Sequence, residues 1–324
     1  MNKFLAGVDV GATQTKVAIL DLKGHILLKD NFSTQMHRKN ALIDAVSDLL
    51  DSLSRRLRLK KRDFLGLGIG VPGLLDFKRG LVFYFINIPA WKNVPLKKLL
   101  EKKTGLPTFV DNDVKVMARG EVTYGAGRGY DNVICLTLGT GVGGAVIIDG
   151  KMRRGQDLVA GEIGHVPINE KGPRCNCGGI GCIEAYVGRE YFLKEVKKDI
   201  RRGVRTSVLA ISNNRIADIT PEMLTKAALG GDRYALNKWR EMGEHLGVAL
   251  TGVVNLLNPE LIIIGGGIAG AGDLVFRPLR ETLKKRAMAI QGRTAKVVRA
   301  KLGNDAGVIG AAELVKINLL KKIS

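Results

Sequence analysis

The stretch Phe4-Leu-Ala-Gly-Val-Asp-Val-Gly-Ala-Thr-Gln-Thr-Lys-Val-Ala-Ile-Leu20 decides the fold. Two apolar runs flank a glycine-containing turn, which is the pattern of a β-hairpin. The arrangement returns at Val133-Ile-Cys-Leu-Thr-Leu-Gly-Thr-Gly-Val-Gly-Gly-Ala-Val-Ile-Ile-Asp149. When the two stretches are superposed without a gap, Asp9, Gly11, Ile19 and Asp21 coincide with Thr137, Gly139, Ile147 and Asp149. This self-similarity predicts an α/β fold built from two copies of one strand-rich unit, facing each other across a cleft.

The length and composition fit two globular domains. The chain has 324 residues, 45% of them hydrophobic. A chain of this size buries a sizeable core, and its composition excludes a disordered, collagenous or disulfide-rich protein. We expect an N-terminal lobe at 1–120, closed by a C-terminal helix at 305–324, and a second lobe at 121–304. Residues 151–200 have no counterpart in the first half and are predicted to be an insertion.

Hydrophobic periodicity predicts the remaining elements. Leu42, Val46, Leu49, Leu53 and Leu57 recur at helical spacing, whereas compact apolar runs favour buried strands. The expected strands are 4–10, 16–22, 25–29, 64–71, 108–111, 133–138, 145–149, 261–264 and 296–300, with a turn at 139–144. Further helices are expected at 114–124, 245–257, 275–288 and 305–316.

The chain is strongly basic. Fifty-one Lys and Arg against thirty-one Asp and Glu give a formal net charge of +20. Positive charge attracts nucleic acid, but the basic residues form short runs that aromatic residues, only 5% of the chain, do not interleave. We therefore expect a general basic surface, with polyanion binding as the alternative. The beginning of the chain lacks a signal-peptide pattern, and glycines break the longest uncharged stretch, so we expect a cytoplasmic protein without a membrane segment.

Three of the four cysteines lie close together in the sequence. Cys175, Cys177 and Cys182 follow His165, and three thiolates with one imidazole are the ligand set of a closed structural zinc site. Glycines around the cysteines form a loop suited to wrapping an ion. Buried free thiols are the alternative interpretation. Cys135 lies inside an apolar strand and is expected to be a core residue.

The run Asp111-Asn112-Asp113 lies where a strand ends and a helix begins. An Asp there is often only a helix cap. The functional alternative is a general base that takes a proton from a hydroxyl, because phosphoryl transfer needs little beyond positioning and charge neutralisation. Polar residues in other loops, each of which also has a plain surface interpretation, are candidates for a wall that reads sugar hydroxyls: Asn87, Glu162 and Glu184.

The glycine turns are candidates for phosphate binding. Gly11-Ala-Thr13 and Gly139-Thr140-Gly141 each join two strands, so backbone N–H groups and hydroxyls are available to an anion. Tight turning alone is the alternative. Gly265 to Gly270 matches G-x-G-x-x-G after a strand, but the next strand ends in basic residues rather than the acid that a dinucleotide needs. Gly266 and Gly267 are therefore expected to form a backbone floor under an adenosine.

Together these motifs resemble the ROK family of sugar kinases and sugar-responsive repressors, over nearly the whole chain. The matching stretches are Asp9-x-Gly-Ala-Thr-x-Thr-Lys16, Asn87-x-Pro-x-Trp91, Asp111-Asn-Asp113, Leu138-Gly-Thr-Gly-x-Gly-Gly144, Gly161-Glu-x-Gly-His165 and Cys175-x-Cys-Gly-x-x-Gly-Cys-x-Glu184. The resemblance implies two RNase H-like lobes of the actin-like ATPase type, with the zinc loop inserted in the second.

The resemblance also implies residue roles. Asp113 would be the catalytic base. The sugar would be bound by Asn87, Asn112, Asp113, Glu162, His165 and Glu184, with His165 also serving the zinc. ATP and Mg²⁺ would be bound by Asp9, Gly11, Thr13, Lys16, Gly139, Thr140, Gly141, Gly266 and Gly267. Two positions depart from the family pattern: Lys115 follows the base closely, and Ala90 replaces a glycine common before Trp91.

We therefore expect a kinase that uses Mg-ATP to phosphorylate a hexose, with glucose favoured. Fructose, mannose, N-acetylmannosamine, N-acetylglucosamine and a polyphosphate donor remain alternatives, because small differences in a pocket change selectivity only modestly. A sugar-sensing regulator is the second hypothesis. The family's repressors have a helix-turn-helix before the first glycine motif, whereas only Met1 to Ala6 precede it in this sequence. We therefore expect no DNA-recognition helix here. Family members commonly form dimers or tetramers, so we expect a homo-oligomer.

Overall fold

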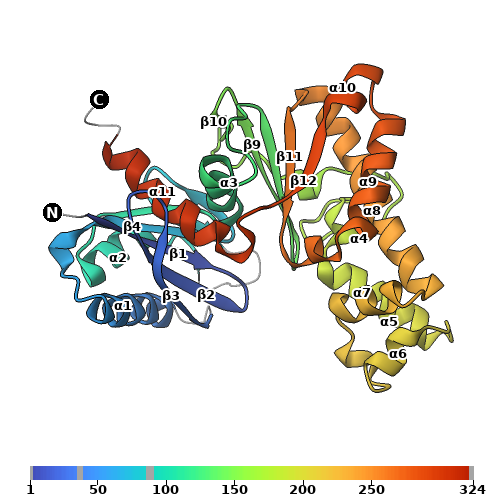
Figure 1. Ribbon diagram of the computed structural model, residues 1–324, viewed down its shortest axis with the longest axis horizontal. Helices are drawn as coiled ribbons and strands as arrows, with labels where there is room; N and C mark the ends of the chain where they lie inside the picture. The colour runs from blue at the N-terminus through green and yellow to red at the C-terminus, as the bar shows by residue number, and fades with distance from the viewer. Residues whose placement is uncertain (1–2, 35–38, 85–90, 321–324) are drawn as a thin grey trace. The chain divides into compact units, whose positions relative to one another are not determined.

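The computed structural model describes residues 3–34, 39–84 and 91–320 and divides the chain into two compact units (Figure 1). Unit 1 contains residues 1–129, 152–160 and 301–324, and unit 2 contains 130–151 and 161–300. The first boundary follows Gly129, beyond the expected position at 120, because the whole helix that begins at Asp113 packs in unit 1. The segment 152–160, expected in the insertion, also belongs to unit 1.

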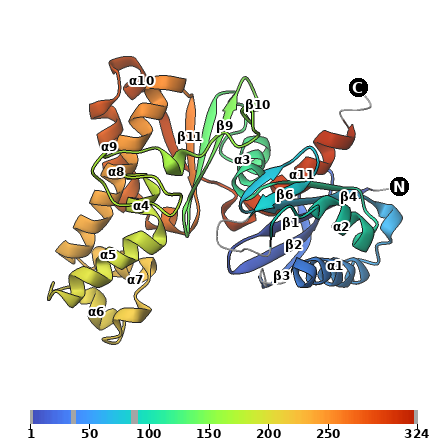
Figure 2. The same cartoon turned by 180° about the vertical axis from the view of Figure 1, so that it is seen from behind.

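Unit 1 is built on a mixed five-stranded sheet. Its strand order is β3-β2-β1-β4-β7, in which β1 is antiparallel to β2 and parallel to β4. The strands are β1 (Phe4–Val10), β2 (Gln14–Leu20), β3 (Ile26–Ser33), β4 (Phe64–Val71) and β7 (Thr108–Asn112). A small ribbon, β5 (Leu74–Asp76) with β6 (Leu81–Tyr84), lies beside it (Figure 2).

Helices cover both faces of this sheet because side chains of β1 alternate between two cores. Ala6, Val8 and Val10 pack with α1 (Lys39–Arg56) and α2 (Leu96–Thr104). Leu5 faces the other way, toward α11 (Ala306–Leu320), which lies against α3 (Asp113–Tyr124) (Figure 1). Buried between sheet and helix, α11 carries few polar residues, and the end of the chain thus completes the first unit.

Unit 2 repeats the sheet. Its order is β10-β9-β8-β11-β12, which reproduces that of unit 1 strand for strand. The strands are β8 (Val133–Leu138), β9 (Val142–Ile148), β10 (Lys151–Met152), β11 (Leu261–Gly265) and β12 (Lys296–Arg299). β8 ends and β9 begins and ends at the positions that the ungapped superposition of the two hairpins predicts. The expected turn at 139–144 is shorter than predicted, because Val142 already pairs with Leu138.

The helices of unit 2 include several that periodicity did not identify. The long helix α8 (Arg233–Leu257) packs against α9 (Asp273–Arg286), and both contribute to a core with β8 and β11. α8 begins well before the predicted start at residue 245. Its N-cap is Asp232, whose side chain accepts a hydrogen bond from the backbone N–H of Ala235. The other helices are α4 (Glu184–Val187), α5 (Arg189–Arg201), α6 (Ser207–Ile211), α7 (Pro221–Leu229) and α10 (Ala289–Thr294).

Among the described residues, no helix is both long and apolar enough to span a bilayer.

Candidate active site

The run Asp111-Asn112-Asp113 joins β7 to α3 in unit 1. Asn112 is the N-cap of α3, and its Oδ1 accepts hydrogen bonds from the backbone N–H groups of Val114 at 3.0 Å and Lys115 at 3.3 Å. Its side-chain amide donates to the carbonyl oxygen of Gly73 at 3.3 Å. Asp113 is the first residue of the helix, where the helix dipole stabilises negative charge.

The two carboxylates of this run have different surroundings. Asp111 is buried, and both of its oxygens accept hydrogen bonds from the guanidinium of Arg154, Oδ1 from Nη1 at 2.6 Å and Oδ2 from Nη2. Asp113 is partly exposed. Because Arg154 occupies both oxygens of Asp111, Asp113 is the better candidate for accepting a proton from a substrate.

Lys115, which departs from the family pattern, does not extend into solvent. Only 3% of its surface is exposed, so the residue is buried within the first turn of α3. A buried ammonium requires compensation by negative or hydrogen-bonding groups.

Asp9 is the last residue but one of β1 and lies beside the first turn of α11. A Cβ added to Gly307 would lie 2.3 Å from Asp9 Oδ2, so a side chain at this position would displace the carboxyl group. Burial raises the pKa of Asp9, and the positive charge of Lys16 acts in the opposite direction. Lys16 in turn donates to the carbonyl oxygen of Asn304 at 2.7 Å. A cation bound here would offset the cost of ionising a buried carboxyl group.

The turn after Asp9 is tight but open to solvent. The backbone N–H of Gly11 donates to the carbonyl oxygen of Gln14 at 3.0 Å, which closes the hairpin. Thr13 is exposed, and its carbonyl oxygen accepts from the N–H of Thr34. The turn therefore presents a hydroxyl-bearing loop next to a buried carboxyl group.

The equivalent turn of unit 2 lies against Glu184. The Oε2 atom of Glu184 accepts a hydrogen bond from the backbone N–H of Val142 at 2.8 Å, and a Cβ on Gly141 would lie 2.3 Å from the same oxygen. A Cβ on Gly139 would meet nothing within 4 Å, and Thr140 is exposed. Gly139-Thr140-Gly141 is thus packed on one side and open on the other.

The turn after β11 lies beside this glycine hairpin. Gly266 has φ +88°, and a Cβ there would lie 2.3 Å from the carbonyl oxygen of Leu138, the last residue of β8. A Cβ on Gly267 would meet no atom within 4 Å. Two of the three glycine segments predicted to bind the nucleotide, Gly139-Thr140-Gly141 and Gly266-Gly267, are therefore neighbours within unit 2.

The predicted metal ligands come together. The ligand atoms of His165, Cys175, Cys177 and Cys182 all lie within 4.8 Å of one another. The sulfur atoms of Cys177 and Cys182 are 3.7 Å apart, and Cys175 Sγ is 3.7 Å from His165 Nδ1. Two sulfurs held at about 2.3 Å by one tetrahedral zinc ion are separated by about 3.8 Å. The donor set and its spacing fit such an ion.

The thiols differ in their electrostatics. Burial raises the pKa of Cys175 to about 12 and also raises that of Cys182. A hydrogen bond from the backbone N–H of Gly179 lowers the pKa of Cys177. Metal binding requires thiolates, so a cation at this place would be coupled to loss of protons from these groups.

Glu184 and His165 connect the cysteine loop with the residues of unit 2 that are predicted to bind sugar and nucleotide. Cys175 Sγ lies 3.7 Å from Glu184 Oε1, while the other oxygen of Glu184 holds the glycine hairpin. His165 ends a short 3₁₀ turn in which its N–H donates to the carbonyl oxygen of Glu162, whose own side chain is exposed. Glu162, His165 and Glu184 thus belong to one unit. Asn87, the remaining predicted sugar contact, lies outside the described residues.

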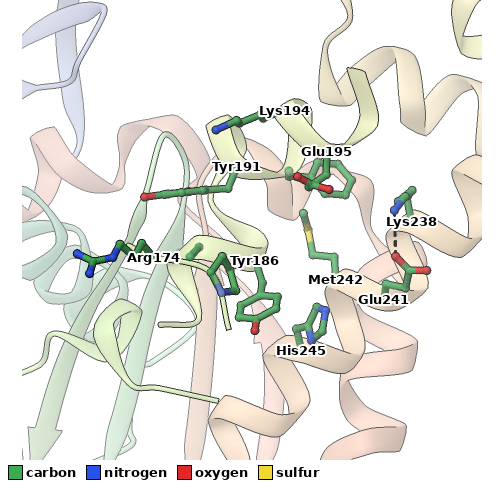
Figure 3. A pocket seen from close by; sticks show the side chains of 12 residues that line it. Arg174, Tyr186, Tyr191, Lys194, Glu195, Lys238, Glu241, Met242 and His245 are labelled. Carbon is green, nitrogen blue, oxygen red and sulfur yellow. Dashed lines mark ion pairs between the residues drawn. The ribbon is translucent and has the colours of Figure 1, made fainter. Parts of the chain in front are cut away.

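A separate cavity of about 590 Å³ is lined in part by residues that flank the cysteine loop in the sequence (Figure 3). Its lining includes Arg174, Tyr186 and Tyr191, together with His245 of α8. Tyr186 and His245 have ring centroids 4.6 Å apart, and burial lowers the pKa of His245. Lys238 and Glu241, which also line the cavity, form an ion pair with each other. Because their charges offset one another, this cavity is a weaker candidate for the active site than the motif residues.

Arg154 is the site residue that sequence reasoning missed. An arginine in a loop is by default a solvated charge, and the sequence signal was limited to its place shortly before Gly161-Glu-x-Gly-His165.

Comparison with known proteins identifies relatives along the whole chain. The ROK family model matches residues 5–318. A glucokinase of Halalkalibacterium halodurans is 37% identical over 97% of this chain and 96% of its own length. The structure of a ROK glucokinase from Streptomyces griseus in complex with glucose and AMPPNP superposes with a TM-score of 0.85 at 34% identity, covering 96% of this chain and 98% of the other. A xylose repressor of Caldicellulosiruptor bescii is 31% identical over 98% of this chain and 79% of its own length.

Proposed function

The chain belongs to the ROK family, and on that premise we propose that it is a sugar kinase that transfers the γ-phosphoryl group of ATP to a hexose, glucose first. The assignment of roles in the run Asp111-Asn112-Asp113 carries the proposal. Arg154 engages Asp111 and Asn112 caps α3, so Asp113 is the carboxylate that we assign as the base. The glucokinases at 34–37% identity, one in complex with glucose and AMPPNP, support the reaction and favour glucose.

We assign roles to residues within each unit. In unit 1, Asp113 accepts the proton of the sugar hydroxyl, whose oxygen attacks the γ-phosphorus as the bond to the ADP oxygen breaks. Asp9 and Thr13 lie at the glycine turn that we assign to the phosphates and Mg²⁺. When bound, Mg²⁺ neutralises charge on the transferring phosphoryl group. Lys16, which restrains the segment before α11, adds positive charge beside Asp9.

In unit 2, we assign sugar and nucleotide contacts to separate edges of one loop cluster. Glu184, Glu162 and the Nε2 atom of His165 are the candidates for sugar hydroxyls, because His165 Nδ1 faces the thiols. The open sides of Gly139-Thr140-Gly141 and Gly267 are the candidates for the phosphates and the adenosine. A zinc ion bound by His165 and the three cysteines would have four protein ligands, so its role is structural: it fixes the loop that ends at Glu184.

A coupled phosphorylation assay tests the proposal. Mg-ATP is supplied with glucose, mannose, fructose, N-acetylmannosamine or N-acetylglucosamine, and polyphosphate replaces ATP in a parallel series. We expect glucose to have the highest kcat/KM. Asp113→Asn should lower kcat about 10²- to 10⁴-fold, the usual contribution of a general base, with the glucose dissociation constant from calorimetry nearly unchanged. Asp273→Asn, which alters a carboxylate of 84% exposure in α9, is the control and should leave kcat unchanged.

A sugar-binding regulator is the second candidate, because the xylose repressor matches nearly the whole chain. The repressor extends beyond the matched part, since this chain covers 79% of it. Glucose or xylose binding by the folded, metal-loaded protein without phosphorylation of any sugar would favour this candidate and contradict the kinase.

A further inference from the structure

We propose that Arg154 is a positioning residue: its paired hydrogen bonds to Asp111 fix the end of β7 and the first turn of α3, and thereby the place of the base. The inference rests on the proposed function for its kinetic consequence, but its structural core does not. The two residues are 43 positions apart in the sequence, and both lie in unit 1.

Arg154 is itself held on several sides. It lies in the segment 152–160, and its carbonyl oxygen accepts a hydrogen bond from the N–H of Ala160 at 2.9 Å. The guanidinium lies over the ring of Phe77, with its central carbon 4.3 Å from the ring centroid. Its side chain is 14% exposed and that of Asp111 is 2% exposed. A planar fork held in this way fixes the carboxylate in direction as well as in position.

The carboxylate passes this constraint to the residues that follow. Asp111 Oδ1 also accepts a hydrogen bond from the backbone N–H of Asn112 at 2.8 Å. Asn112 then caps α3 through two N–H groups and contacts Gly73 through its amide. A rotation of Asp111 would therefore move the peptide before the cap, and Asp113 is the next residue along.

The charge of Asp111 also acts on a second arginine. Arg119 of α3 is largely buried, its Nε has no hydrogen-bond partner among the described residues, and burial lowers its pKa while the charge of Asp111 acts against that shift. One carboxylate thus lies near two guanidinium groups. A buried ion pair is weak evidence for stability, since apolar replacements of both partners often fold as well. The location of this pair directly before the proposed base favours a positioning role instead.

The test uses Arg154→Lys in the full chain. Lysine keeps the charge but cannot form two parallel bonds. A misplacement of about 1 Å at a reacting group costs about 10²-fold in rate, so we expect kcat to fall by about this factor. The KM for the sugar should change less than kcat does. Guanidinium ions should partly restore kcat to Arg154→Ala. Lys238→Met, which breaks a partly buried pair with Asp199 in unit 2, is the control; its kcat should be unchanged and insensitive to guanidinium.

A second readout does not depend on activity. Hydrogen exchange of the amides of Val114 and Lys115, which Asn112 caps, should become faster in Arg154→Lys and not in Lys238→Met. The double variant Asp111→Leu with Arg154→Met replaces both partners of the ion pair, so neither is left buried and unpaired and the chain should fold. It should show the same loss of kcat. Unchanged exchange at these amides, or wild-type kcat in either folded variant, would overturn the proposal. An inactive wild-type protein would instead contradict the kinase assignment, and the exchange result would still decide the role of Arg154.

Discussion

Helices α3 and α11 cross so closely in unit 1 that a single methyl group should separate them. A Cβ added to Gly310 of α11 would lie 1.7 Å from the carbonyl oxygen of Val116 in α3, half of the 3.4 Å at which ordinary contact begins. At the same crossing, a Cβ on Gly120 would lie 2.5 Å from the carbonyl oxygen of Ala306. The obstructing atoms are backbone, so no side-chain rotation relieves the clash.

Gly310→Ala should therefore destabilise the protein although alanine is the better helix former. The propensity gain is about 1 kcal/mol, and overpacking of a core costs about 1–3 kcal/mol. Because backbone must move, we take the upper end of that range and expect a net loss of about 2 kcal/mol in the free energy of unfolding. The displaced helix carries Asp113 at its first residue, so kcat should also fall, about 10²-fold for a shift of about 1 Å.

Gly252→Ala provides the matched control. Gly252 lies inside α8, and a Cβ there would meet nothing within 4 Å. This variant should gain up to about 1 kcal/mol and keep its kcat. Urea unfolding gives the free energies, and the phosphorylation assay gives kcat for the folded protein. If Gly310→Ala were as stable as Gly252→Ala, the argument from the helix crossing would be refuted.

Two further predictions concern protons and metal. Burial lowers the pKa of His245 below its unfolded value of about 6.5, so below that pH the unfolded state binds the proton more readily and stability falls as pH decreases. The free energy of unfolding should decline between about pH 7 and pH 5, and His245→Phe should show a smaller decline in urea titrations; equal declines would contradict this. Zinc analysis should find about one ion per chain, which Cys177→Ser loses and Cys135→Ala, a change in the core of β8, retains. A chelator should lower the melting temperature of the wild type, but full metal content in Cys177→Ser would disprove the assigned ligand.

Local pattern was sufficient for the central strands of both sheets and for the cysteine cluster, but not for the short strands β5, β6 and β10. The two hairpins share an apolar pattern, and the structure has the same strand order in both units. Cys175, Cys177 and Cys182 lie within one loop, so their spacing alone brings them within reach of one another. His165, the fourth ligand that the sequence predicted, lies with them in the structure. Helices α4 and α6 are too short to show an apolar stripe, whereas α5 has one at Phe192, Val196 and Ile200 that the sequence-based prediction did not use. Packing on α8 supports α4 and α7.

What sequence alone determined is the duplicated α/β architecture, the glycine turns, the cluster of one histidine with three cysteines, and the strand-end run that contains Asp113. These are features in which chemistry and spacing lie within a short stretch of chain, so local rules apply to them. Only the tertiary structure decided that Arg154 engages Asp111, that Lys115 is buried, that Glu184 holds the glycine hairpin, and that α11 can approach α3 only where both have glycine. Each of these joins residues distant in sequence, and burial and close packing, which act on the folded chain, determine which of them meet.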